Sequence, residues 1–294
     1  MTQKSFRRWQ VGEVTVTRIV ELETLGGTHF ILPEASRARC LKIGWLAPHF
    51  MNHEGRLRMN VQALVVQTPT RRIVVDTCLG NDKRGREVPH WNGLQTGFLQ
   101  DLADAGLPRE SIDTVLCTHL HVDHVGWNTM FVDGKWVPTF PNARYLIAAP
   151  EYAHWRARHD AALAAGTPSP IFDDSVAPVF DAGLVDLVDV GYRICDEVRL
   201  LPTPGHTPGH VSVEIASGNE RALISGDFVH HPCQLAMPQW TASVDDDPSL
   251  STRTRRETLA RLAGEGTLLI GTHFAGPTAG RVAADGDAWR LDVD

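Results

Sequence analysis

The segment CTHLHVDHVGWN, residues 117–128, contains three histidines and one aspartate in the spacing H-x-H-x-D-H. A chain of 294 residues with 14 His and 35 acidic residues would contain this spacing by chance in about one case in several hundred. Imidazole nitrogens and carboxylate oxygens both bind Zn²⁺ and similar ions, at roughly 2.0–2.2 Å. The segment therefore predicts a metal site, with four candidate ligands: His119, His121, Asp123 and His124.

Three more candidate ligands lie at the ends of predicted strands: His206 in TPGHTPGH, Asp227 in SGDFVHH and His273 in GTHFAGP. Each is flanked by Gly or Pro, which permit the tight turns by which a strand end presents one side chain. Two divalent ions that share Asp227 and one hydroxide would lower the pKa of that water toward neutrality and polarise an electrophilic centre. A structural zinc site would favour cysteine ligands, and none of the five cysteines has a suitable spacing. These ligands predict a dinuclear hydrolase, with Zn²⁺ as the first choice of metal and Mn²⁺, Co²⁺ or Fe²⁺ as alternatives.

The elements that must position these ligands are indicated by hydrophobic periodicity. Residues 13–21 alternate at period two, and the apolar runs 62–68 and 72–77 flank a turn, which predicts a hairpin. Helical spacing marks three segments: 97–107, 150–166 and 249–264. Further strands are predicted at 113–118, 143–149, 197–203, 210–216, 221–227 and 267–273.

Two segments resist assignment. Residues 26–58 are too long for an ordinary loop, and we expect them to form an arm that covers the site or packs on a partner. Residues 165–178, AGTPSPIFDDSVAP, are compatible with either a surface loop or a short helix.

Composition bounds the class of protein. The length and the 43% hydrophobic content suit one α/β domain over residues 1–294 with a sizeable core. A net charge of -7 argues against a basic surface for nucleic acid. The N-terminus has no apolar stretch of a signal peptide, and the chain has no apolar run long enough for a membrane span. Five scattered cysteines suit a reducing compartment, so we expect a cytoplasmic protein without membrane partners.

The chain resembles the metallo-β-lactamase fold hydrolases. The matching residues are Asp76 in IVVDT, followed in order by THLHVDH, GHTPGH, SGD and GTH over about 200 residues. The resemblance implies an α/β fold, a four-layer αββα sandwich with the site at one edge of its two sheets. It also implies that Asp76 orients ligands without binding metal, as carboxylates behind a metal site generally do.

The resemblance further implies how the ligands divide. One metal would be held by His119, His121 and His206, the other by Asp123, His124 and His273, with Asp227 as the bridge. In the resulting mechanism a bridging hydroxide attacks carbon or phosphorus, one metal stabilises the oxyanion, and Asp123 helps to move a proton.

Other residues near the motifs have open roles. We expect His210 to be structural, because the family pattern uses only the first histidine of its loop. His230, His231 and three candidate pocket residues, Trp127, Asn128 and Trp240, could serve either the site or the packing. A tryptophan-rich chain weakly favours a hydrophobic or aromatic small-molecule substrate.

Some residues of this chain differ from the patterns of individual subgroups of the family, which reduces the number of possible activities. β-Lactamases generally lack the bridging aspartate, and flavodiiron proteins have a glutamate at the position of His121. Lactonases usually have a tyrosine three residues after the bridge, whereas this chain has His230, which resembles the branch of methyl parathion hydrolase. His230 would then be a catalytic residue that donates a hydrogen bond to the carbonyl or leaving group.

The sequence thus predicts a hydrolase of ester-like, lactone or other electrophilic small molecules. Alternatives are a hydrolytic dehalogenase or phosphotriesterase of the same fold, a metal-dependent nuclease, and a non-catalytic ligand-binding protein stapled by metal. The resemblance also favours a homodimer.

Overall fold

The computed structural model describes residues 5–26, 28–167 and 170–293. Contacts divide the chain into two compact units, each built from two stretches of sequence. Unit 1 comprises residues 1–21 and 61–190, and unit 2 comprises residues 22–60 and 191–294. The expectation of one domain over the whole chain stays a prediction.

A seven-stranded sheet runs through unit 1, in the order β1-β2-β3-β4-β5-β8-β9. Its strands are β1 (Arg8–Val11), β2 (Val14–Leu25), β3 (Arg58–Gln67), β4 (Arg72–Val75), β5 (Thr114–Cys117), β8 (Arg144–Ala148) and β9 (Val185–Val188). β3 and β4 form the predicted antiparallel hairpin, and β2 and β3 each include residues of both units. The four strands from β4 to β9 are parallel, and their residues are nearly all apolar where the sheet is buried.

The carboxyl ends of these parallel strands meet at one edge of the sheet. Val75 of β4 pairs with Leu116 of β5, and Cys117 pairs with Ile147 of β8. Asp76 directly follows β4, and the first histidine of the opening motif lies two residues after β5. Side chains at this edge of an open α/β sheet commonly form the binding site.

Helices of unit 1 cover the sheet and continue from its strand ends. The α-helices are α2 (Phe98–Asp104), α3 (Val122–Val125), α4 (Ala149–Ala164) and α5 (Ala177–Asp181). Pro150 lies in the first turn of α4, where its missing N–H costs nothing, and α4 packs against β8 and β9. Short helical turns occupy η3 (Pro89–Trp91), η4 (Arg109–Ser111) and η5 (Gly126–Asn128), and β6 (Thr129–Val132) and β7 (Lys135–Pro138) form a separate hairpin.

The segment 165–178 is partly helical. A π-helical turn, η6 (Phe172–Val176), leads directly into α5. Of the two interpretations of this segment, the short helix is therefore confirmed, except that Pro168 and Ser169 lie outside the described residues.

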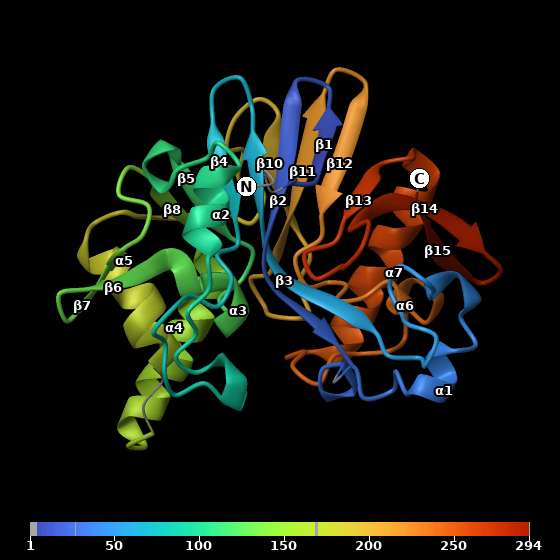
Figure 1. Ribbon diagram of the computed structural model, residues 1–294, viewed down its shortest axis with the longest axis horizontal. Coiled ribbons are helices and arrows are strands. Elements are labelled where there is room, and N and C mark those ends of the chain that lie inside the picture. The colour runs from blue at the N-terminus through green and yellow to red at the C-terminus, as the bar shows by residue number, and fades with distance from the viewer. Residues whose placement is uncertain (1–4, 27, 168–169, 294) are drawn as a thin grey trace. The chain divides into compact units, whose positions relative to one another are not determined.

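Unit 2 contains a six-stranded sheet with strands in chain order. They are β10 (Val198–Pro202), β11 (Val211–Ser217), β12 (Glu220–Ile224), β13 (Leu268–Ile270), β14 (Ala279–Asp285) and β15 (Ala288–Asp292). Only β12 and β13 pair in parallel, and the connection between them contains α6 (Cys233–Ala236) and α7 (Pro248–Glu265). Asp247 caps α7 by accepting the N–H of Leu250, and Gly266 ends it in the left-handed conformation. Figure 1 shows α7 beside β14 in this unit.

The predicted arm, residues 26–58, contributes to the core of unit 2. It carries η1 (Thr28–Phe30), α1 (Arg37–Cys40) and η2 (Gly44–Leu46). Its buried side chains, among them Leu32, Leu46 and Phe50, belong to one apolar cluster with Leu223 and Trp240. Burial of this apolar surface holds the arm in place, although its helical segments are short. A role in covering the site or binding a partner stays a prediction.

No helix in the described parts of the chain has both the length and the apolar character needed to cross a membrane.

Candidate metal centre

The loop after β5 is fixed by Asp76, which has a positive φ of 60°. The Asp76 carboxylate accepts the backbone N–H of Thr118 at 2.8 Å and its hydroxyl at 2.9 Å. The same carboxylate lies 2.9 Å from Nδ1 of His124 in α3. One buried aspartate therefore orients both ends of the loop that carries the H-x-H-x-D-H motif.

The tautomers of two histidines follow from these contacts. Nδ1 of His124 faces a carboxylate, which only accepts, so this nitrogen carries the proton. The Thr118 hydroxyl gives its proton to Asp76, so its oxygen accepts from Nδ1 of His119 at 3.1 Å. Both neutral rings then present the lone pair of Nε2, the arrangement found in histidines that bind metal.

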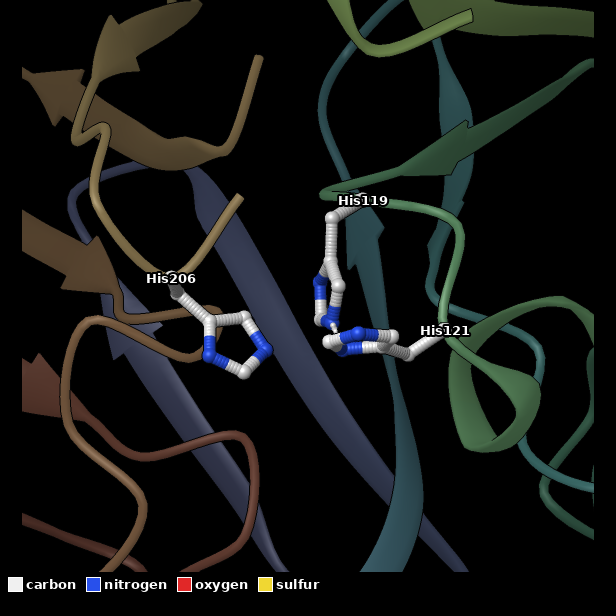
Figure 2. Close-up of side chains that lie close together, drawn as sticks. All are labelled: His119, His121 and His206. Carbon is white, nitrogen blue, oxygen red and sulfur yellow. Dashed lines mark hydrogen bonds between the residues drawn. The ribbon is translucent and has the colours of Figure 1, made fainter. Parts of the chain in front are cut away.

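His121 precedes α3 and lies against His119. Nε2 of His119 is 2.9 Å from Nδ1 of His121, and the two rings are nearly perpendicular, at 87°. Figure 2 shows this pair in unit 1 and His206 on its loop in unit 2. Glu151 of α4 supports the loop between the two rings by accepting the N–H of Leu120 at 2.9 Å.

Asp123 is partly buried, with 18% of its side chain accessible. Its Oδ1 lies 3.7 Å from Nε2 of His124. A carboxylate that remains accessible beside a histidine donor can both bind a cation and exchange protons with solvent.

In unit 2, three histidines converge on Asp227. Nε2 of His273 lies 3.2 Å from Oδ1 of Asp227, and Nε2 of His230 lies 3.2 Å from Oδ2. Nε2 of His206 lies 3.6 Å from the same Oδ2. These residues follow β10, β12 and β13, so the turns after three strands of one sheet bring them together.

In unit 2 the orientation of the candidate ligands is also fixed by acceptors that bind the Nδ1 atom of each ring. Nδ1 of His206 donates to Asp245 at 2.8 Å, and Nδ1 of His273 donates to the carbonyl oxygen of Asn60 at 2.7 Å. In the neutral rings the Nε2 lone pairs consequently face the Asp227 carboxylate, which also has only lone pairs to offer. A divalent cation resolves this arrangement of donors, so the residues fit a metal site.

His230 is buried among these donors. Donor atoms of His206, Asp227 and His230 all lie within 4.8 Å of one another. Burial lowers the pKa of His230, although the Asp227 carboxylate opposes the shift. Nε2 of His230 has the Asp227 carboxylate 3.2 Å away, and Nδ1 has no hydrogen-bond partner among the described residues. His230 thus lies inside the candidate centre; its role there stays a prediction.

The two remaining histidines of these loops use both ring nitrogens within unit 2. His210 accepts the N–H of Asp227 at Nε2, 2.7 Å away, so its Nδ1–H donates to the carbonyl oxygen of Thr203. His231 donates from Nε2 to the carbonyl oxygen of Phe50 and accepts the N–H of Cys233 at Nδ1. These contacts are structural, as expected for His210.

The three candidate pocket residues are all buried. Trp127 donates from Nε1 to Glu21 at 2.7 Å and stacks on Phe98, while Asn128 accepts the hydroxyl of Thr77. Trp240 belongs to the core of unit 2, where the guanidinium of Arg39 lies 4.7 Å from its ring centre. The observed contacts are hydrogen bonds and packing with protein groups, and a role in substrate binding stays a prediction.

Sequence reasoning missed the groups that hold the ligands from behind in unit 2. Asp245 stands in the run VDDDP, where spacing does not distinguish it from Asp246. Asn60 acts through its backbone carbonyl, which has no signature in the sequence. The signal that could have identified Asp245 is a general one: a histidine that binds metal needs an acceptor for its other nitrogen.

A sequence model of the metallo-beta-lactamase superfamily matches residues 57–273, which include every candidate ligand. The chain belongs to the metallo-beta-lactamase superfamily. The expected α/β fold of this superfamily is confirmed by solved members. AidC, a dizinc quorum-quenching lactonase solved with a product, has a TM-score of 0.77 at 20% identity and covers 99% of this chain and 98% of its own. The hydrolase AbOPH has a TM-score of 0.77 at 24% identity, covering 98% and 97%.

Relatives within the superfamily share about a quarter of the aligned sequence. The probable metallo-hydrolase YflN of Bacillus subtilis is 27% identical over 147 residues, 44% of this chain and 54% of that protein. A probable metallo-hydrolase of Mycobacterium bovis is 26% identical over 216 residues, 68% of this chain and 66% of that protein. An N-acyl homoserine lactonase of Bacillus sp. is 27% identical over 157 residues, 52% and 53%. The chain therefore spans between about half and two thirds of the length of these relatives.

Proposed function

We propose that the protein is a dinuclear-metal hydrolase of small molecules, with lactones as the first substrate class. One observation carries the proposal: Nδ1 of His119, His124, His206 and His273 is held by an acceptor within its own unit, so each ring presents Nε2. Histidines that bind metal have this arrangement, because an acceptor behind the ring fixes its tautomer and direction. Membership of the superfamily supports the proposal independently.

The seven residues predicted from the sequence would hold two divalent ions, for which we propose Zn²⁺, with Asp227 bound to both. When bound, such ions lower the pKa of water and polarise the group under attack. Asp123 would receive the proton released in the reaction and pass it to solvent, because 18% of its side chain is accessible. Asp76 and Asp245 would fix the orientation and the tautomer of the rings of His124 and His206.

The names of the relatives favour lactones as the first substrate class. The relatives include a protein named N-acyl homoserine lactonase, and the structural neighbours include a dizinc lactonase. His230 departs from the lactonase pattern, which usually has a tyrosine at this position, but it could take the part of that tyrosine. Since burial lowers its pKa, the neutral ring keeps one N–H, which can be donated to the carbonyl or leaving oxygen of a substrate. We extend the proposal to a homodimer and to substrates with an apolar part.

The test measures acid release in a pH-stat from zinc-loaded and chelated protein, across lactones, aryl esters, phosphotriesters and chlorinated aromatics. Metal-dependent turnover of lactones supports the proposal, whereas preference for phosphotriesters or aryl halides assigns the protein to the alternative branch. Asp227→Ala should lose second-metal occupancy and most turnover, while Asp246→Ala, an exposed aspartate, should retain both. Full activity of Asp227→Ala with a full complement of metal would overturn the mechanism.

The role of His230 is tested separately. If it donates to the substrate, His230→Tyr should retain lactone turnover, and His230→Phe should lose it without loss of metal. Equal activity of both variants would assign His230 to packing.

If the metal-loaded protein turns over no substrate of the panel, the alternative of a non-catalytic ligand-binding protein is favoured. If the metal serves only to stabilise the fold, its removal should unfold the protein. If the metal is catalytic, the apoprotein should stay folded and regain activity when zinc is returned.

A further inference from the structure

Glu21 is a partly buried carboxylate of β2 that the proposed mechanism does not use. Its Oε2 accepts the N–H of Leu79 at 2.7 Å. Its Oε1 accepts the N–H of Gly80 at 3.3 Å, the hydroxyl of Thr96 at 3.1 Å and Nε1–H of Trp127 at 2.7 Å. Four donors from three separate segments of unit 1 therefore meet on one side chain.

The first of these segments, the turn 76–80, has an unusual backbone. Asp76 and Cys78 have positive φ angles of 60° and 52°, which residues with a side chain rarely adopt. Such a conformation persists only where surrounding contacts hold it. The two N–H bonds to Glu21 close the end of this turn, directly after Cys78.

The turn 76–80 is itself hydrogen-bonded to α3 and to the residues after it. The carbonyl oxygens of Thr77 and Cys78 accept the N–H groups of Trp127 and Gly126, both at 2.7 Å. The N–H of Thr77 donates to the carbonyl oxygen of His124 at 2.8 Å. A Cβ atom on Gly126 would lie 1.9 Å from the backbone of Leu79, so the two segments are in direct backbone contact.

Glu21 consequently binds both partners of this contact, the turn through Leu79 and the segment after α3 through Trp127. The turn begins with Asp76, which orients His124, and α3 carries Asp123. Burial raises the pKa of Glu21, while its four hydrogen bonds favour the carboxylate.

We propose that Glu21 is a positioning residue for the metal held by Asp123 and His124, acting through the turn 76–80 and Trp127. The inference rests on the proposed function, because it assigns these two ligands to a metal. It predicts an asymmetric effect: loss of the Glu21 carboxylate weakens the binding of one ion of the pair and leaves the other unchanged.

The experiment compares the full-length wild type with Glu21→Gln, which keeps the size but places an NH₂ group against donors. The control is Glu23→Gln, in the same strand, where 58% of the side chain is exposed. Zn²⁺ and Co²⁺ titrations with a competing chelator should show one equivalent bound as in wild type and the second bound about 10–100-fold more weakly. The visible spectrum of the cobalt protein should change, and kcat at saturating metal should fall with little change in KM.

A purely structural role would lower the urea midpoint and leave the affinity for both ions, the cobalt spectrum and kcat unchanged, which would overturn the proposal. If Glu21→Gln does not fold, Trp127→Phe removes a single donor to the carboxylate and should shift the same quantities in the same direction. No shift there would overturn the proposal as well.

Hydrogen exchange of the metal-free proteins separates this inference from the proposed function. Glu21→Gln should speed exchange of the amides of residues 77–80 and 126–127, and Glu23→Gln should not. If exchange is unchanged, Glu21 is not the positioning group, even if the protein is a hydrolase. Failure of the wild type to bind metal or hydrolyse any substrate would instead remove the proposed function, and faster exchange in Glu21→Gln would still show that Glu21 sets the position of this segment.

Discussion

Nδ1 of His206 donates a hydrogen bond of 2.8 Å to Asp245, a residue 39 positions further along the chain. The other oxygen of Asp245 accepts the N–H of Ala242 at 3.0 Å and lies 3.8 Å from the Arg255 guanidinium. Burial alone would raise the pKa of Asp245, but His206, His230 and Arg255 hold it below its ordinary value. The ring of His206 is therefore oriented by a buried carboxylate that stays ionised.

Replacement of Asp245 by Asn should weaken metal binding. The amide removes the charge that stabilises the Nδ1–H tautomer of His206, and such acceptors typically account for a 10–100-fold difference in metal affinity. Titration of apoprotein with zinc and a competing chelator measures the change. Asp246→Asn, with an exposed side chain, is the control, and equal affinities of the two variants would contradict the prediction.

Arg255→Met should destabilise the protein by about 3–5 kcal/mol, because it leaves a buried carboxylate without its cation. The fully buried guanidinium also donates to three carbonyl oxygens, those of Phe228, Pro238 and Trp240. Burial lowers the pKa of Arg255 to about 10, so the group is still charged at neutral pH. Urea unfolding measures the loss, and exposed Arg256→Met should change stability by less than about 0.5 kcal/mol. Similar losses of stability in both variants would show that the burial of Arg255 beside Asp245 has no particular effect on stability.

Metal should raise the melting temperature of the apoprotein. At a free zinc concentration 100 times Kd, one site stabilises the folded state by about 2.7 kcal/mol. For a chain of this size the corresponding shift is on the order of 5–10 °C. Calorimetry with and without zinc gives the shift, which should be smaller in Asp227→Ala; identical shifts in the two proteins would place the bound metal elsewhere.

Stability of the apoprotein should fall as the pH drops from 6.5 to 4 because of His231. Burial lowers the pKa of this histidine to about 4, against a hydrogen bond from its ring to Phe50 that raises it. Between these values the unfolded chain binds a proton that the folded chain does not, so the contribution is complete above pH 6.5 and lost toward pH 4, amounting to about 3 kcal/mol. Urea unfolding of wild type and His231→Gln over this range, in a chelator, should show a shallower pH dependence in the variant. Parallel curves would rule out His231 as the cause.

Most of what the sequence predicts concerns residues that lie directly after strands. His119, His206 and His273 could be found because apolar runs end just before them, and the strands that carry them are confirmed. The hairpin of β14 and β15 was not predicted, although Gly286-Asp287, the two residues between the strands, is a signal for one.

Other features have no local signature. Glu21 stands in an alternating strand, where a charged residue normally indicates the solvent face. Its partners come from distant segments, at Leu79, Thr96 and Trp127. Phe50 and Leu32 occur without periodicity, because they fill gaps against strands that are far along the chain. Long-range packing of this kind cannot be read from a window of sequence.

The core of unit 2 is assembled from both ends of the chain, which matters while the protein is being made. Leu32 and Phe50 leave the ribosome long before Leu223 and Trp240, the residues against which they pack. At a synthesis rate of about 5–20 residues per second, this delay lasts on the order of 10–40 s. During that interval the first part of unit 2 has apolar side chains but no core, so the nascent chain offers a binding site for chaperones that the finished protein lacks.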